Sequence, residues 1–382
     1  MGKNQKAARK VMKVLYVGCY RDGTGWGNAA IDYILSMDQA GIDVVPRPLR
    51  LDKTNGHIPK RIEELEKKDS SGADVCIQHV LPHLMEYNPN FKKNIALYAT
   101  ETTNFKDSGW ARNINMLDEA WVINNQMFHA SKDSGVDIPI KVVPHATDFS
   151  KFERSYEKIN IPNVEDNFVF YTIADLNRRK NLEALIKAFH MEFEPDEPAS
   201  LLIKTSQYGL TPDETARKLR DVSNAIKIGL KKFSSLEDYK EDLMITDYLS
   251  SEDINRLHAT GDCFVIPSHG EAWCIPAFDA MGFGKTPICT NIGGMKDFIG
   301  NGGFLVEGNM EPVFGMTRTF KRLFTCNEDW CSVSVRGLME AMRHVYENQE
   351  KLKNMKSEGL SQAYKYSYSK IGNLIKDLLH AN

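Results

Sequence analysis

The chain of 382 residues is long enough for two or three domains, each with its own buried core. Apolar residues make up 42% of it, charged residues 26% and aromatic residues 10%, which is typical of a compact globular protein and not of a disordered or fibrous one. The 48 Lys and Arg residues nearly match the 51 Asp and Glu residues, so the net charge of -3 excludes a global cationic field that would attract nucleic acid or anionic lipid.

No run of about 18 apolar residues occurs, and the N-terminus, MGKNQKAARKVMKVLYVGCY, lacks the apolar core and small-residue cleavage site of a signal peptide. We therefore expect a cytoplasmic protein without an integral membrane segment. The seven cysteines are an odd number and show no CxxC spacing, which indicates reduced, mostly buried thiols and no zinc site.

In the first part of the chain, short apolar runs alternate with helix-compatible stretches. A strand over residues 14–17, a glycine-rich turn and a helix that buries Ala30, Ile31, Ile34 and Leu35 form a βα unit. Further strands are predicted at residues 75–77, 95–98, 121–123 and 141–143. This alternation predicts a parallel sheet covered by helices, ending near Pro144.

After a connector at residues 148–167, the alternation begins again. Strands are predicted at residues 168–173, 201–204, 243–246, 263–266, 287–290 and 304–306, with a helix at 182–193 among them. Helical spacing returns at residues 333–346 and 371–379. We expect an α/β protein with two doubly wound, Rossmann-like domains, at residues 1–150 and 151–360. A C-terminal helix at 361–382 is expected to pack back on the first domain.

Ligands of such sheets bind at the carboxyl ends of the strands, so the loops there are the candidate site. The first of these loops, RDGTGWGN at residues 21–28, lets the backbone approach a phosphate or a sugar, and a helix N-terminus follows it. A tight strand-to-helix turn explains the same glycines equally well. The GxGxG spacing does not favour a dinucleotide site.

The most informative segment is PSHGEAWCIPAFDAMGFG at residues 267–284, which follows a buried strand. Pro276 is suited to begin a helix and Gly284 to end it. Glu271 would then lie in the strand-end loop and Asp279 one turn into the helix. Both carboxylates could accept hydrogen bonds from sugar or ribose hydroxyls of one ligand, while helix N–H groups cover its phosphates.

This segment resembles the E-x7-E signature of retaining glycosyltransferases with the GT-B fold, especially glycosyltransferase family 4, the glycosyl transferases group 1. Other segments are similar to the family in the same order along the chain: residues 101–136, PHATD at 144–148, ADLNRRKN at 174–181, residues 246–268, and TNIGGMKD at 290–297. The resemblance therefore covers most of the chain.

The resemblance implies a nucleotide-diphosphate sugar donor on the C-terminal domain, an acceptor hydroxyl on the N-terminal domain, and no catalytic metal or further cofactor. By position, Glu271 would contact the donor sugar, Asp279 the ribose, and Lys180 and Arg179 the departing diphosphate. The other donor contacts implied are Gly25, Trp26, Arg178, His269, Ala272, Trp273, Cys274, Gly293 and Gly294. On the acceptor side the candidates are His79, Glu101, Thr102 and His145. The acceptor would be a glycan, a lipid, a protein or a modified nucleic acid.

The chain departs from the family pattern at three places. Asp279 stands where the family has Glu, which shortens its reach by one methylene. Asp175 stands where the family has Arg, so Arg178 or Arg179 would have to compensate. The family often has a His where this chain has Glu101 with its neighbouring threonines.

Each candidate also has a structural explanation. Glu271 could be a solvated loop acid, Asp279 an acid that stabilises the helix dipole, and Lys180 a surface residue of a basic cluster. His79, His145 and His269 could be structural residues that form hydrogen bonds. Trp26 and Trp273 could be core aromatics.

The resemblance implies a retaining, metal-independent glycosyltransferase. Three alternatives stay open. The departures at Asp175 and Asp279 fit a catalytically weak protein that binds sugar nucleotides. The basic stretch from Lys3 to Lys13 fits a glycosyltransferase acting on modified bases in DNA. A nicotinamide-dependent two-domain enzyme is disfavoured because the dinucleotide fingerprint is missing.

Overall fold

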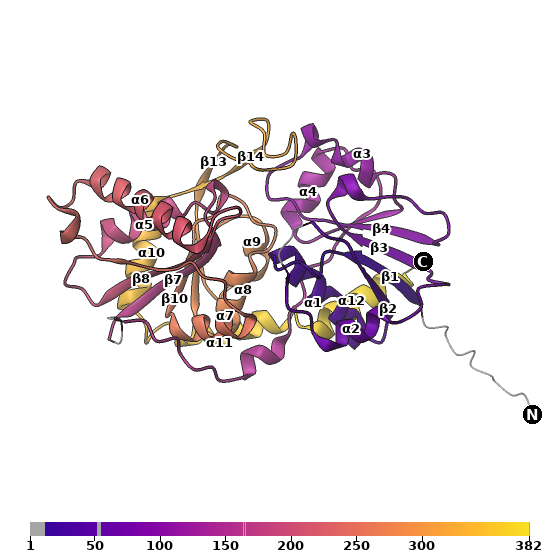
Figure 1. Cartoon of the computed structure of the whole chain (residues 1–382), viewed down its shortest axis with the longest axis horizontal. Coiled ribbons are helices and arrows are strands. Elements are labelled where there is room, and N and C mark those ends of the chain that lie inside the picture. The colour runs from indigo at the N-terminus through magenta and orange to yellow at the C-terminus, as the bar shows by residue number, and fades with distance from the viewer. Residues whose placement is uncertain (1–11, 52–54, 163, 165, 382) are drawn as a thin grey trace, which may run out of the picture.

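The structure, a computed structural model, describes residues 12–51, 55–162, 164 and 166–381. Most of the basic stretch at Lys3 to Lys13 therefore lies outside the described residues. The described chain forms two α/β domains that lie side by side, with the C-terminal helices crossing between them (Figure 1). The predicted α/β class with two Rossmann-like domains is confirmed, while the predicted domain limits stay a prediction.

The N-terminal domain contains a parallel sheet with the strand order β2-β1-β3-β4-β5-β6. Its strands are β1 (Lys13–Gly18), β2 (Asp43–Pro48), β3 (Val75–His79), β4 (Lys93–Leu97), β5 (Glu119–Val122) and β6 (Ile140–Val142). The helices are α1 (Gly25–Gln39), α2 (Lys60–Glu66), α3 (Trp110–Ile114) and α4 (Asn125–Asp133). Helices cover both faces of the sheet, and this is why its strands read as continuous apolar runs.

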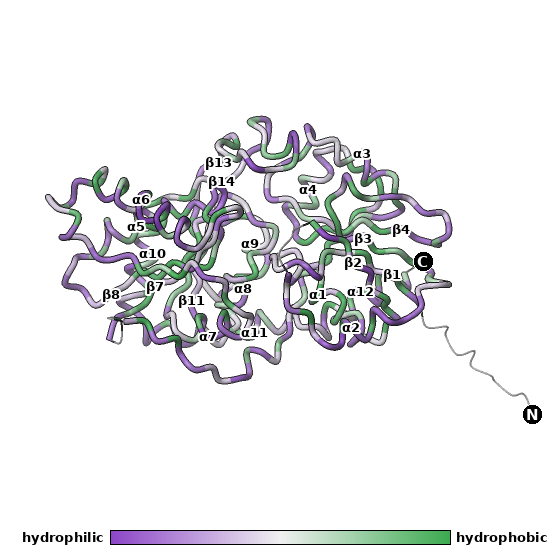
Figure 2. Tube along the Cα trace, in the orientation of Figure 1, coloured by the Kyte–Doolittle hydropathy of each residue, from purple (hydrophilic) through white to green (hydrophobic). Residues whose placement is uncertain are grey.

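The C-terminal domain repeats this architecture with the strand order β12-β11-β10-β7-β8-β9. Its strands are β7 (Phe168–Asp175), β8 (Ala199–Ser206), β9 (Asp242–Ile245), β10 (Cys263–Ile266), β11 (Thr286–Thr290) and β12 (Phe304–Val306). The helices are α5 (Leu182–Glu192), α6 (Pro212–Leu230), α7 (Ser251–Thr260), α8 (Ile275–Gly282), α9 (Gly294–Phe298), α10 (Val335–Glu347) and α11 (Lys353–Tyr364). Figure 2 shows that the central strands of both sheets are apolar.

Two chain crossings connect the domains at one end of their interface. Thr147, in the linker after β6, donates its N–H to Tyr366 O at 2.9 Å, and Tyr368 donates its N–H back to Thr147 O at 3.0 Å. The last helix, α12 (Tyr368–His380), then lies against α1 of the N-terminal domain and buries Ile371, Ile375 and Leu379 there. The two segments that pass between the domains, around Thr147 and at residues 366–368, are therefore hydrogen-bonded to each other, and we call them together the hinge.

An arm of the C-terminal domain bridges the domains at the other end, the top of the view in Figure 1. Strands β13 (Gly308–Pro312) and β14 (Asp329–Val333) form an antiparallel hairpin, and residues 313–328 between them reach the N-terminal domain. Thr103 exchanges two hydrogen bonds with Asp329, and the ring of Phe320 stacks on His83 with centroids 4.2 Å apart. The interface between the domains is thus bounded by the hinge and by this arm.

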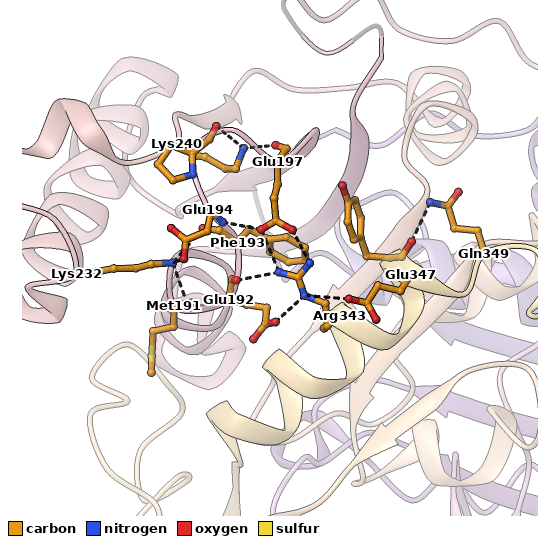
Figure 3. Close-up of polar contacts among 12 residues, drawn as sticks. Met191, Glu192, Phe193, Glu194, Glu197, Lys232, Lys240, Arg343, Glu347 and Gln349 are labelled. Atoms are coloured by element: carbon orange, nitrogen blue, oxygen red, sulfur yellow. Dashed lines mark hydrogen bonds and ion pairs between the residues drawn. The ribbon is translucent and has the colours of Figure 1, made fainter.

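Far from the hinge, one arginine ties α10 to the end of α5 (Figure 3). Arg343 lies 2.7 Å from Glu192 and 2.5 Å from Glu197, and its guanidinium carbon lies 4.6 Å from the centroid of Phe193. These contacts hold the α5–β8 connection on the outer side of the C-terminal domain.

Candidate functional site

The segment around Glu271 joins β10 to α8. Cys274 caps α8 in the left-handed conformation at φ 70°, Pro276 lies in the first helical turn, and Gly284 follows the helix at φ +68°. The helix begins one residue earlier than predicted, at Ile275. Because the strand ends at Ile266, Glu271 lies in the loop at the carboxyl end of the sheet.

Two cations and a hydroxyl surround the buried carboxylate of Glu271. Lys180 Nζ lies 2.5 Å from Oε1 and Arg179 Nη1 lies 3.3 Å from Oε2, while Ser268 Oγ donates to Oε1 at 2.7 Å. Burial alone would raise the pKa of Glu271, but the charges of Lys180 and Arg179 outweigh it and lower the pKa to about 2. Glu271 is therefore ionised and held in one place. This excludes the explanation that Glu271 is merely a solvated acid of the loop.

Both cations come from the loop after β7. Asn177 accepts a hydrogen bond from Lys180 N at 3.1 Å, and this bond caps the short helix Arg178–Lys180. Arg179 also donates to Gly270 O at 2.7 Å, so it braces the backbone next to Glu271. Asp175 lies exposed at the end of β7, where Ser206 Oγ contacts it at 3.4 Å, and Arg178 is 3.4 Å from Glu183.

The N-terminal domain closes over this cluster. Arg179 Nη2 lies 3.6 Å from Glu101 Oε1, and a Cβ added to Gly270 would meet Glu101 O at 2.0 Å, so the two backbones nearly touch. Thr102, the neighbour of Glu101, donates instead to Glu328 Oε2 of the arm at 2.7 Å. The structure thus brings Glu101 to Glu271 and places Thr102 against the arm.

A glycine turn after β11 packs on the other side of the Glu271 loop. Gly293 has φ +59°, and a Cβ there would lie 1.8 Å from Glu271 O, so glycine is required by both conformation and space. Gly294 donates its N–H to Glu271 O at 3.3 Å. Three residues of the N-terminal domain also contact this region: Asn124, Asn125 and Gln126. They were not predicted as site residues, because polar residues at the start of a helix usually serve only as caps.

Asp279 does not share the surroundings of Glu271. Its carboxylate lies 2.7 Å from Lys151 Nζ, a residue of the linker between the domains. Burial raises the pKa of Asp279, and Lys151 opposes this rise. Nearby, Asp32 of α1 lies 3.1 Å from His145 Nε2 and accepts a hydrogen bond from Tyr368 OH at 2.5 Å. Asp279 and His145 therefore belong to a charged cluster at the hinge.

The glycine-rich loop forms the start of α1, where Thr24 caps the helix by accepting from Gly27 N at 3.2 Å. Gly25 is exposed and Trp26 is half-buried, with its ring 5.1 Å from the ring of His79. Burial, followed by the charge of His145, lowers the pKa of His79 to about 3, and its Nδ1 lies 2.6 Å from Tyr16 OH. His79 is therefore a neutral, buried ring that supports Trp26.

The remaining predicted donor contacts lie around the same loop. His269 is buried, stacks on Trp330 of β14 with centroids 4.4 Å apart, and donates from Nδ1 to Cys331 O at 2.8 Å. Trp273 is a buried core aromatic that packs on Phe278 and Phe298, and Cys274 is buried too. The backbone of Ala272 accepts from Asn124 Nδ2 at 2.5 Å.

A separate cavity of about 720 Å³ lies on the outer side of the C-terminal domain, between α6, β9 and residues 159–162. Its buried Asp242 is bonded by His190, Ser223 and Lys227, so the polar groups there satisfy one another. None of the predicted site residues lines this cavity. Within the described ranges, no group of three or more His, Cys, Asp or Glu side chains could hold a metal ion, and no helix is long and apolar enough to cross a membrane.

The two facing parallel sheets define a GT-B fold, the architecture of solved structures that superpose on nearly the whole chain. The Anabaena protein HepE, in complex with UDP-glucose, matches with a TM-score of 0.66 at 13% identity and covers 97% of this chain and 100% of its own. Sucrose-phosphate synthase from Thermosynechococcus elongatus matches with a TM-score of 0.66 at 12% identity, over the same shares of the two chains.

Residues 154–313, which span most of the C-terminal domain, match the model of the family Glycosyl transferases group 1. Sulfoquinovosyl transferase SQD2 of Arabidopsis thaliana is 28% identical over 141 residues, which cover 33% of this chain and 27% of the relative. The serotype-specific mannosyltransferase WbdA of Escherichia coli is 28% identical over 144 residues, covering 38% of this chain and 16% of the relative. The chain therefore matches about a quarter or less of the length of these relatives.

Proposed function

We propose that the protein is a retaining, metal-independent glycosyltransferase of family 4 that moves a sugar from a nucleotide diphosphate to an acceptor hydroxyl. The observation that carries the proposal is the buried Glu271 carboxylate held by Lys180 and Arg179, inside the domain that matches the glycosyltransferase family. The complex of HepE with UDP-glucose supports a nucleotide-sugar donor by analogy. The free thiols of all seven cysteines are consistent with action in the cytoplasm.

In this proposal the donor lies on the C-terminal domain with its sugar at Glu271. The bond between the anomeric carbon and the phosphate oxygen breaks, and its electron pair leaves with the diphosphate. Lys180 and Arg179 stabilise the charge that develops there. The acceptor oxygen attacks the same face of the sugar, and its proton passes to the departing phosphate. Both cations are paired with Glu271, so the donor diphosphate competes with one carboxylate for them.

The domains divide the work between donor and acceptor. In this proposal Gly25 and Trp26 approach the donor from the N-terminal domain, and Glu101, beside Arg179, contacts the acceptor. The acceptor is a hydroxyl-bearing glycan, lipid, protein or modified nucleic acid. Asp279 is tied to Lys151, so a direct ribose contact requires that this ion pair rearrange.

The test is the release of free nucleotide from UDP-, GDP-, ADP-, CDP- and TDP-sugars. We expect the wild type to hydrolyse one donor slowly, and Glu271→Ala and Lys180→Ala to lose about 10²- to 10³-fold in rate. Glu358→Ala, which removes an exposed acid of α11, is the matched control and should keep the wild-type rate. Full activity in both site variants would overturn the assignment. Nucleotide binding without turnover of any donor would favour a binding protein.

A further inference from the structure

Three consecutive residues at the β5–α4 corner of the N-terminal domain each bond to the C-terminal domain. Asn124 Nδ2 donates to Ala272 O at 2.5 Å, Asn125 N donates to Asp297 Oδ2 at 2.9 Å, and Gln126 Oε1 accepts from Gly293 N at 2.9 Å. We call this segment the 124–126 corner. It contacts the Glu271 loop and the glycine turn from across the domain interface.

Gln126 differs from its two neighbours because it contacts a backbone N–H group of the candidate donor site. The direction of this N–H is fixed, because the turn has a positive φ at Gly293 and packs without space on the backbone of Glu271. The next amide, Gly294 N, is bonded within its own domain to Glu271 O. The Gly293 amide has a partner from the other domain, so it is exposed whenever the domains separate.

We propose that Gln126 is a positioning residue that accepts a hydrogen bond from the Gly293 amide, as it does in this structure, and yields this amide to a phosphate oxygen of the donor. This inference rests on the proposed function, in which Lys180 contacts the donor diphosphate, and on the donor contact that the resemblance implies for Gly293. A charged phosphate oxygen accepts a stronger hydrogen bond than a neutral amide oxygen, so the donor displaces Gln126.

The displacement of Gln126 weakens donor binding. Every donor molecule that binds must break the hydrogen bond between Gln126 and Gly293, so the free energy of this bond is subtracted from the free energy of donor binding. A side chain without an acceptor would remove this competition. A carboxylate in the same place would keep the competing oxygen and add repulsion toward the diphosphate.

The experiment measures nucleotide diphosphate binding by titration calorimetry, with UDP, GDP, ADP, CDP and TDP as probes. For the nucleotide that binds, we expect Gln126→Ala to lower Kd about two- to tenfold. The donor KM in the hydrolysis assay should fall by the same factor while kcat is unchanged. Gln126→Glu should raise Kd about tenfold at low salt, and added salt should shrink the difference.

Asn125→Ala is the matched control, because it removes a side-chain contact across the same seam and leaves the Gly293 amide paired. It should change Kd by less than about twofold. An equal fall in Kd for Asn125→Ala and Gln126→Ala would mean that looser closure is the cause, and would overturn the proposal. An unchanged or higher Kd in Gln126→Ala would overturn it as well, with the proposed function intact. Binding by Gln126→Ala where the wild type is silent would support both proposals, and silence in every variant would overturn both.

Discussion

Lys151 Nζ lies 2.7 Å from Asp279 Oδ1, so a cation of the interdomain linker neutralises the second carboxylate of the predicted site. Both side chains are largely buried, and Asp32 and Asp148 also stabilise the charge of Lys151. Despite burial, which would lower it, these acids raise the pKa of Lys151. The pair therefore joins helix α8 to the hinge.

Lys151→Met should destabilise the protein by about 3–5 kcal/mol at pH 7, because it leaves the buried carboxylate of Asp279 without a cation. The double variant Lys151→Met/Asp279→Asn should recover much of this loss, since no charge is then left unpaired. The free energy of unfolding in urea measures both effects. Burial already raises the pKa of Asp279, so the loss in Lys151→Met should shrink as the pH falls and the carboxyl group is protonated. A loss that is equal in the single and double variants would contradict the pairing.

The ion pairs of Glu271 should make stability depend on pH. The pKa of Glu271 is lowered from 4.5 to about 2 in the folded protein, so its stabilising contribution is complete above pH 4.5 and is lost as the pH falls toward 2. We expect the wild type to exceed Glu271→Gln in unfolding free energy by about 2–3 kcal/mol at pH 7. This advantage should decline between pH 4.5 and pH 2. Urea denaturation at a series of pH values tests it, and a constant difference would refute it.

The parallel strands could be predicted because both faces of each sheet are covered, and continuous apolar runs such as residues 263–266 result. Strand β2 could not, because two prolines interrupt it, and proline is tolerated there since β2 lies at the sheet edge. Helix α6 carries its own signal, a capping box at Thr211 and Glu214 with Pro212 in the first turn.

The cluster of Glu271 with Arg179 and Lys180 could be predicted, because the loops after β10 and β7 meet at one edge of the sheet. By contrast, the pairing of Asp279 with Lys151 and of Gly293 with Gln126 depends on how the two domains are placed. Residues more than a hundred positions apart form these contacts, and local periodicity carries no information about them.

The arm should dock less tightly on the N-terminal domain when the buried hydrogen bond between Thr102 and Glu328 is removed. Glu328 is fully buried, and burial raises the pKa of its carboxyl group even though Thr102 Oγ1 donates to it. Thr102→Val leaves this group without its side-chain donor, at a cost of about 1–3 kcal/mol to arm docking. We expect faster hydrogen exchange of the amides at residues 313–328.

Asp107→Ala gives a second test of the arm, because it removes the bonds from Thr325 Oγ1 at 3.0 Å and Asn327 Nδ2 at 2.7 Å. The exchange of the same segment should rise in this variant too, but less, since Asp107 is only half-buried whereas Glu328 is fully buried. Strands β7 and β8 serve as the internal control and should keep their protection. Unchanged exchange of residues 313–328 in both variants would show that these bonds do not hold the arm.

We expect the contacts of Arg343 to contribute to the free energy of unfolding and to leave the rate of donor hydrolysis unchanged (Figure 3). Its guanidinium bonds to Glu192 and to both oxygens of Glu197 while it stacks on Phe193, and a lysine ammonium cannot reproduce this planar arrangement. Arg343→Lys should therefore lower the unfolding free energy by about 1–2 kcal/mol, with the donor hydrolysis rate unchanged. Arg336→Lys, an exposed position on the same helix, is the control and should have an effect within about 0.5 kcal/mol. Equal stability of the two variants would mean that the charge alone, and not the planar fork, fixes α10 to α5.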